Sequence, residues 1–158
     1  MEKKSLLVRF KEKMQSVRAK DIMSTEIIAV QEDMRFADLA KLMLERRISG
    51  APVIKKDGKM AGIITTTNLQ EAMFLIKKSG EVFENAMETI MNPKVDFFAT
   101  KNTFCIKEDT SLEEMIDIME ERNIHTLPVM GNDKLVGIVG RHDIFMSFYK
   151  ILQELCPY

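Results

Sequence analysis

The fold is decided by a stretch that occurs twice in the chain, EDMRFADLAKLMLERRISGAPVI at residues 32–54 and EDTSLEEMIDIMEERNIHTLPVM at residues 108–130. The two copies align without a gap, so the acidic pair, the helical pattern and the proline recur in register. Self-similarity of this kind is the signature of a supersecondary unit that occurs more than once. The chain therefore contains two copies of one unit.

The match extends beyond this stretch in both directions. Downstream, KDGKMAGIITTTNL at 56–69 aligns with GNDKLVGIVGRHDI at 131–144, where the turn is one residue shorter. Upstream, KDIM ending at Met23 aligns with ETIM ending at Met91. On this alignment the second copy carries eight extra residues, within NPKVDFFATKNT at 92–103. We expect this insertion to be a surface loop or a hairpin arm.

The apolar pattern within each copy predicts the order β, α, β, β, α. Apolar residues recur at helical spacing in 36–44 and 112–119. Short apolar runs bounded by turn residues, as buried strands are, occur at 51–54, 60–64, 127–130 and 135–139. A three-stranded sheet with two helices cannot bury its sheet alone. We therefore expect an α+β fold in which two βαββα repeats pack sheet to sheet about a pseudo-twofold axis, with extra terminal helices.

The same pattern predicts the segments of the chain. We expect an N-terminal helix at 1–19, a first repeat at 20–78, a linker at 79–86, a second repeat at 87–150 with its insertion at 92–103, and the end of a C-terminal helix at 151–158. The terminal helices carry more apolar surface than one small unit needs, which predicts a homodimer.

Composition argues against several classes of function. Lys and Arg number 23 against 24 Asp and Glu, so no global field attracts nucleic acid or an anionic membrane. The two cysteines show no zinc-binding spacing, and no apolar run is long enough to span a membrane. The 13 methionines lie mostly on apolar faces and are better explained as core filler than as metal ligands. We expect a cytoplasmic protein with no metal, no nucleic-acid partner and no membrane span.

Motifs of the first copy, DIM, SGAPVI, DGK and GIITTTNL, reappear in order as TIM, HTLPVM, NDK and GIVGRHDI. Over residues 20–150 this pattern resembles a tandem pair of the cystathionine-beta-synthase (CBS) domain family. The resemblance implies a regulatory module, not an enzyme, that binds AMP, ADP, ATP or S-adenosylmethionine in clefts between the repeats. It also implies a flat homodimer. Because 158 residues leave no room for a fused enzyme, we expect a stand-alone pair.

The resemblance also implies where a nucleotide would bind. In the family, the third residue after the glycine of the last strand is often a Ser or Thr facing phosphate, and the sixth is often an Asp that accepts from both ribose hydroxyls. In the second copy these positions hold Gly140 and Asp143, with Arg141 and His142 between them. A carboxylate suits a diol because it only accepts hydrogen bonds. A helix start and an arginine both suit a phosphate.

By the same resemblance, residues of both copies complete the predicted cleft at Asp143. They are Gly140, Arg141, His142 and His125 near the phosphates, Ser49, Gly50 and Ala51 as backbone partners of adenine, and Ile28 on the face of the base. Symmetry suggests a second, weaker cleft formed by Thr65, Thr66, Asn68, Thr126 and Leu127. These positions carry no aromatic side chain, so base recognition would rest on aliphatic packing and main-chain bonds. An amide accepts at only one atom, so we prefer the Asp143 cleft to the Asn68 cleft.

Simpler interpretations of these residues stay open. Asp143 and Asn68 stand where the N-cap of a helix belongs, and capping alone accounts for either side chain. Thr65 and Thr66 are ordinary strand residues, and exposed histidines at a helix start need no ligand. A ligand-free dimeric scaffold that acts by protein contact is the alternative function. An enzyme is the weakest interpretation, because the chain has no GxSxG, HExxH or Walker motif.

Overall fold

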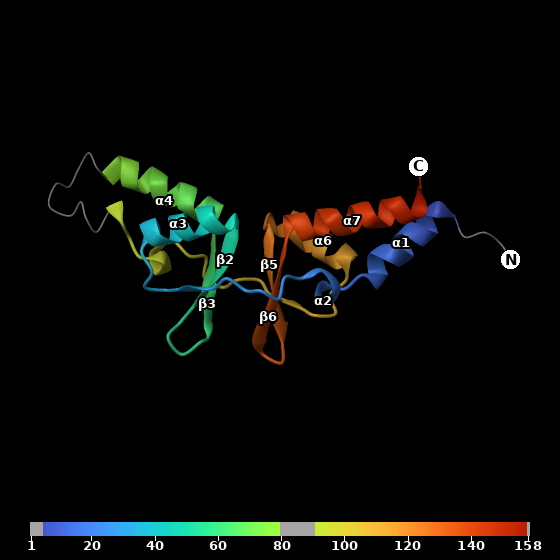
Figure 1. The fold of residues 1–158 in the computed structure, drawn as a ribbon, viewed down its shortest axis with the longest axis horizontal. Coiled ribbons are helices and arrows are strands. Elements are labelled where there is room, and N and C mark those ends of the chain that lie inside the picture. Colours follow the sequence, from blue (N-terminus) through green and yellow to red (C-terminus); the bar gives the residue numbers. More distant parts are fainter. Residues whose placement is uncertain (1–4, 80–90, 158) are drawn as a thin grey trace. The chain divides into compact units, whose positions relative to one another are not determined.

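The computed structural model describes residues 5–79 and 91–157, and its contacts divide the chain into two units (Figure 1). The first-repeat unit comprises residues 28–103. The second-repeat unit comprises the residues up to 27 together with those from 104 onward. The expected linker, 79–86, lies outside the described residues except for Ser79.

The first-repeat unit has the predicted βαββα order. Its elements are β1 (Val30–Gln31), α3 (Phe36–Arg46), β2 (Gly50–Ile54), β3 (Met60–Thr65), α4 (Thr66–Ser79) and the 3₁₀ helix η2 (Val95–Phe97). The sheet order is β1-β2-β3, with β1 parallel and β3 antiparallel to β2. The core consists of Val30, Leu39, Met43, Ala51, Val53, Ile64 and Val95.

The second-repeat unit repeats this architecture and also contains the N-terminal helix. Its elements are α1 (Leu6–Ser16), α2 (Ala19–Ile22), β4 (Ile106–Lys107), α6 (Leu112–Arg122), β5 (Thr126–Gly131), β6 (Lys134–Gly140) and α7 (Arg141–Leu155). The sheet order β4-β5-β6 has the same parallel and antiparallel pairing. The prediction of one βαββα unit occurring twice is confirmed.

Local sequence fixes where the first helix of each repeat begins and ends. In α6, the hydroxyl of Ser111 accepts the N–H of Glu114 (3.2 Å), and the Glu114 carboxylate accepts the N–H of Ser111 (2.8 Å). This reciprocal pair satisfies two backbone donors that a helix start leaves unpaired. The helix ends at Asn123 in the left-handed region (φ 50°), and α3 ends in the same way at Arg47 (φ 52°). Both helices therefore stop after the same length.

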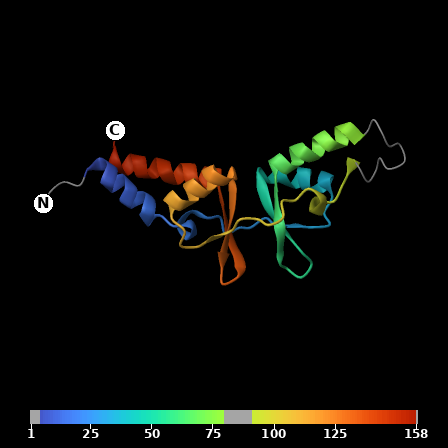
Figure 2. The same ribbon diagram turned by 180° about the vertical axis from the view of Figure 1, so that it is seen from behind.

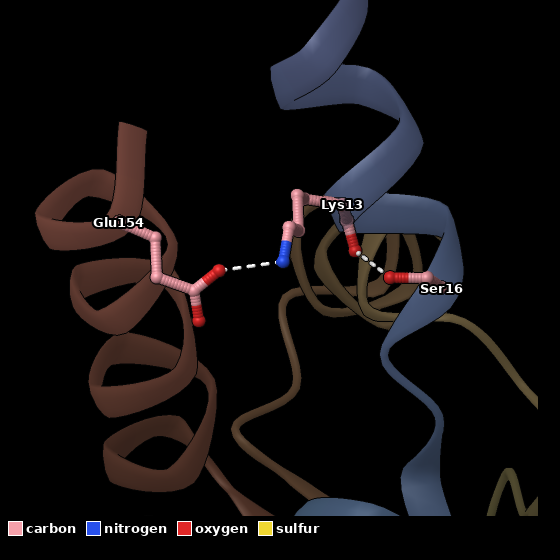
Figure 3. A network of polar contacts seen from close by, with 3 residues as sticks. All are labelled: Lys13, Ser16 and Glu154. Atoms are coloured by element: carbon pink, nitrogen blue, oxygen red, sulfur yellow. Dashed lines mark hydrogen bonds and ion pairs between the residues drawn. The ribbon is translucent and has the colours of Figure 1, made fainter. Parts of the chain in front are cut away.

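Helix α1 packs on α6 and α7 of its own unit (Figure 2). The rings of Phe10 and Phe148 meet edge to face, with centroids 5.5 Å apart, and Met14 is buried. At the surface, Lys13 donates to the carboxylate of Glu154 over 2.5 Å, while the Lys13 carbonyl accepts from Ser16 (Figure 3). An exposed ion pair adds little stability, so apolar packing holds α1 in place.

Each unit also contains the short segment that precedes the other repeat in sequence. We call these segments the first lead, residues 17–24, and the second lead, residues 93–100. The first lead packs in the second-repeat unit, where Ser24 exchanges both backbone hydrogen bonds with Ile138 (2.9 and 3.0 Å). The second lead packs in the first-repeat unit, where Thr100 does the same with Ile63 (2.8 and 3.0 Å). Each lead thus adds a bridge to the open edge of a sheet.

The two leads correspond at a constant spacing of 76 residues, as from Ala19 to Val95. The N–H of Ala19 donates to the carbonyl of Thr110, and that of Val95 donates to the carbonyl of Met34, each over 2.8 Å. Ala19 and Val95 are both fully buried. The structure therefore matches Met23 with Ala99, not with Met91 as the sequence alignment suggested.

Residues 92–103 are consequently not the surface loop or hairpin arm that the sequence suggested. Val95 is 2% exposed and belongs to the core of the first-repeat unit. The apparent insertion results from aligning KDIM with ETIM by residue identity. The true equivalence is held by backbone hydrogen bonds, which leave little trace in side-chain identity.

Candidate functional site

Asp143 lies in the first turn of α7, next to the end of β6. Its Oδ2 accepts the backbone N–H of Gly140 over 2.7 Å. Helix α7 begins at Arg141, so Gly140 is the N-cap and Asp143 is the third residue of the helix. The expectation that Asp143 itself is the N-cap is therefore wrong by three residues. Capping still uses one carboxylate oxygen of Asp143, and Oδ1 makes no hydrogen bond to the described residues.

The arginine and the histidines predicted near Asp143 come together at the same helix start. The backbone N–H of Arg141 donates to the carbonyl of His125 over 3.1 Å, which ties the start of β5 to the start of α7. Arg141, His142 and His125 are all exposed. Because a helix N-terminus carries partial positive charge, this corner of the second-repeat unit favours an anion.

Asn68 occupies the equivalent position in the first-repeat unit, but its environment differs. It is 8% exposed, and its Oδ1 accepts both the N–H and the hydroxyl of Thr65, each over 3.0 Å. Its Nδ2 donates to the hydroxyl of Thr100 over 3.3 Å. Asn68, like Asp143, is the third residue of its helix and not the N-cap. Three hydrogen bonds within its own unit hold the amide.

The remaining predicted residues occupy matching places in the two units. Ser49 and His125 precede β2 and β5, and the carbonyl of Ser49 accepts the N–H of Thr66 (3.0 Å) as that of His125 accepts from Arg141. Gly50 pairs with Thr65 across the sheet, and Thr126 pairs with Gly140. Further residues of the predicted sets are buried (Ala51, Thr126 and Leu127), half-buried (Ile28) or exposed (Thr66).

The structure thus brings the predicted residues together in two groups. Gly140, Arg141, His142, Asp143, His125, Thr126 and Leu127 belong to the second-repeat unit, and Ile28, Ser49, Gly50, Ala51, Thr65, Thr66 and Asn68 belong to the first-repeat unit. Each predicted cleft draws on both groups.

Phe104 is a candidate residue that sequence reasoning missed. It stands 76 residues after Ile28, immediately before β4, and is 36% exposed. The guanidinium of Arg122 lies 4.0 Å from the centroid of its ring. Phe104 also lines an open groove of about 410 Å³ with Lys107, Glu114 and other residues of the second-repeat unit. The gapless spacing of 76 residues identifies Phe104 as the counterpart of Ile28. The expectation that the predicted clefts carry no aromatic side chain did not take this position into account.

The environment of Cys105 disfavours the thiolate form. Burial raises the pKa of its thiol above the ordinary value. Among the residues that the structure describes, no group of three or more His, Cys, Asp and Glu side chains is placed to hold a metal ion. Over the same residues, no helix combines the length and apolar character needed to cross a bilayer.

Comparison with known proteins identifies close resemblances in sequence and fold. The family model described as CBS domain matches residues 19–75 and 88–150. The uncharacterized protein MJ1426 of Methanocaldococcus jannaschii is 31% identical over 147 residues, which cover 79% of this chain and 87% of that protein. The chain spans only 22–23% of the length of several curated enzymes that it also matches.

Two solved structures share the fold and contain ligands. The CBS domain pair of protein MJ0100, in complex with 5′-methylthioadenosine and S-adenosyl-L-methionine, has a TM-score of 0.70 at 24% identity and covers 85% of this chain and 97% of its own. CBSX2 in complex with AMP has a TM-score of 0.69 at 21% identity, with coverages of 86% and 98%. At these identities the likeness shows the fold alone.

Proposed function

Because the chain belongs to the CBS domain family, we propose that it is a regulatory module that binds an adenosine-type nucleotide at the start of α7. In this proposal the module reports the presence of the nucleotide to another protein and catalyses no reaction. The single observation that carries the proposal concerns the carboxylate of Asp143. Its Oδ2 accepts the N–H of Gly140, while its Oδ1 makes no hydrogen bond to the described residues.

This carboxylate can accept hydrogen bonds from a ribose. The bond from the Gly140 N–H holds Oδ2 in place, and Oδ1 has no partner among the described residues. A ribose offers two adjacent hydroxyl donors, which match an ionised carboxylate because it only accepts. Hydrogen bonds to a charged group contribute about 1.5–3 kcal/mol each. Asp143 therefore supports recognition of the ribose.

The same helix start supports recognition of a phosphate. Helix α7 is 15 residues long, and its N-terminus carries partial positive charge. Arg141 extends this potential into solvent, His142 is exposed next to it, and the backbone bond from Arg141 keeps His125 beside them. Arg141 presents a planar fork of donors that fits phosphate oxygens.

The ligands of two structural relatives support the proposed ligand class. The ligands named for MJ0100 and CBSX2, which are 5′-methylthioadenosine, S-adenosyl-L-methionine and AMP, share the adenosine group. We assign adenine recognition to the backbone of Ser49, Gly50 and Ala51 and to the side chain of Ile28, as the family pattern implies.

A ligand-free homodimeric scaffold is the second candidate function, and one observation favours its dimeric part. Phe145, Tyr149 and Leu152 of α7 are 65%, 45% and 40% exposed. Their spacing of four and three residues places them on one stripe of the helix. A second copy of this chain would bury that stripe in a twofold contact. A dimer is compatible with nucleotide binding, so the two candidates differ only in the ligand.

Thermal unfolding with a panel of AMP, ADP, ATP and S-adenosylmethionine separates the two candidates. A ligand that binds only the folded chain raises its melting temperature in a concentration-dependent manner. The proposed function predicts such a rise for at least one of the four. If none of the four ligands raises the melting temperature and the chain is a stable dimer, the ligand-free scaffold is the function that agrees with the result.

A further inference from the structure

We propose that Asn68, Thr65 and Thr100 form a clasp that closes the ribose position of the first-repeat unit, so that each chain binds one nucleotide, at Asp143, and not two. This inference rests on the proposed function and concerns its stoichiometry. All three residues of the clasp belong to the first-repeat unit.

The orientation of the Asn68 amide is fixed by its neighbours. The backbone N–H of Thr65 can only donate, so the atom 3.0 Å from it must be the amide oxygen. The amide nitrogen then points to the hydroxyl of Thr100, 3.3 Å away. The Thr100 backbone is itself held by two hydrogen bonds to Ile63. The second lead therefore fixes one side of Asn68 and the end of β3 fixes the other.

The clasp uses the groups that a nucleotide would need. The hydroxyl of Thr65 has one proton, and it is donated to the oxygen of Asn68, so it is not available to a phosphate. The oxygen of Asn68 already accepts two hydrogen bonds, which fills its two lone pairs. A ribose hydroxyl would have to displace a bond that the folded chain already makes.

Burial adds to this closure. Asn68 is 8% exposed, and it lines a cavity of only about 10 Å³ together with core residues such as Leu39, Ile64 and Val95. A space of this size holds at most one water molecule. A ligand therefore has no room in this cavity.

The second-repeat unit lacks the clasp although its backbone is the same. Ser24 occupies the place of Thr100, but its hydroxyl donates to the carbonyl of Glu26 (3.5 Å) and not to Asp143. Gly140 occupies the place of Thr65 and has no hydroxyl to donate. Asp143 is consequently less buried than Asn68 and keeps one oxygen for a ligand.

The experiment is to open the clasp and count bound nucleotides. Titration calorimetry of the full chain with AMP gives the number of sites per chain for the wild type and for the double variant Asn68→Asp, Thr100→Ala. The aspartate can still accept the N–H of Thr65, and the alanine frees its second oxygen. We expect one site in the wild type and two in the double variant. Two sites in the wild type, or one in the double variant, would overturn the inference.

Two further variants keep the test decisive. The double variant Asn68→Asp, Thr100→Val also removes the Thr100 hydroxyl but keeps the size of the side chain, so it serves if the alanine variant does not fold; it should also gain a site, and a failure to do so overturns the clasp. Thr67→Asp, an exposed neighbour, adds the same charge at the same helix start and should leave one site. A second site in Thr67→Asp would attribute the gain to charge alone and overturn the inference.

A failure of the proposed function gives a different result. In that case the wild type binds no AMP. The clasp is then judged by the double variant, in which one new site supports it and no site overturns it. Weaker binding at the wild-type site in Asp143→Asn, with the double variant still gaining a site, would show that both statements hold.

Discussion

Gly62 and the carbonyl oxygen of Thr100 approach so closely that a Cβ on Gly62 would overlap that oxygen. At Gly137 in the second-repeat unit, an added Cβ would instead overlap the side chain of Met23, which is the counterpart of Ala99 and not of Thr100. Glycine is therefore required at Gly62, where the contacted atoms are backbone, and is less strictly required at Gly137, where they belong to a side chain. In both repeats the glycine of the last strand faces the lead, but non-equivalent residues of the two leads make the contact.

Gly62→Ala is expected to destabilise the chain by about 1–3 kcal/mol, the usual cost of forcing extra atoms into a packed site. The neighbouring atom is backbone, which cannot move aside as a flexible side chain can. Urea unfolding gives the free energy of unfolding, with Lys59→Ala, an exposed change in the same hairpin, as the control. Equal stability of Gly62→Ala and the control would mean that the second lead does not cross β3 as described.

Val95→Ala tests whether the second lead is core. Removing two buried methyl groups should cost about 2 kcal/mol of unfolding free energy. Phe97→Ala is the matched control, since Phe97 lies two residues away in the same 3₁₀ helix and is 79% exposed. Its effect should stay below about 1 kcal/mol. A small effect of Val95→Ala, no larger than that of the control, would restore the idea of a peripheral segment.

The sequence predicted the regular elements better than the leads. The gapless match of 32–54 with 108–130 captured strands and helices because both depend on apolar periodicity, which side chains record. Each lead packs in the unit of the other repeat through backbone hydrogen bonds, such as those between Ser24 and Ile138. The equivalent residues Ala19 and Val95 have only their burial and small size in common. An alignment by residue identity therefore pairs Met23 with Met91, although the structural counterpart of Met23 is Ala99.

The candidate site was predicted to a similar extent. Residues of one turn, such as Gly140 and Asp143, were grouped correctly because they are close in sequence. The N-cap was misplaced by three residues. In this capping box Asp143, the third residue of the helix, accepts the N–H of the N-cap residue Gly140, and an aspartate in that position resembles an N-cap when only the sequence is known. The clasp at Asn68 could not be foreseen, since Thr100 was assigned to a peripheral loop.

The acid stability of the chain should depend on Glu114. Hydrogen bonds from the backbone and then the side chain of Ser111 hold the pKa of this carboxyl below its ordinary value, with a smaller contribution from Arg18. A lowered pKa in the folded chain means that Glu114 stabilises it above the ordinary pKa of a glutamate. That stabilisation is lost as the pH falls through the lowered value.

Glu114→Gln removes the charge but keeps a side chain that can accept in the capping box. The difference in unfolding free energy between wild type and Glu114→Gln should therefore be larger at about pH 7 than at about pH 3. Glu121→Gln, an exposed change on the same helix without a bond to Ser111, is the control. A difference that does not shrink in acid, or that shrinks equally for Glu121→Gln, would contradict this account.

The exposed stripe on α7 should be a dimer contact. Tyr149→Arg places a charge in the middle of the stripe, between Phe145 and Leu152, and is expected to give a monomer by light scattering, whereas the wild type is expected to be a dimer. Leu44→Arg, at a 78% exposed position of α3, is the matched control and should remain a dimer. A wild type that is monomeric at micromolar concentration, or a dimeric Tyr149→Arg, would exclude this contact.

Calorimetric titration of wild type and Asp143→Asn with AMP tests the central claim most directly. Asparagine can still accept the N–H of Gly140, so the unfolding free energy without ligand should change little. Nucleotide binding should nevertheless weaken by about 1–3 kcal/mol, because hydrogen bonds from the ribose to a charged acceptor are lost. Equal affinity of the two proteins for AMP, or no binding by either, would show that Asp143 serves only to cap α7.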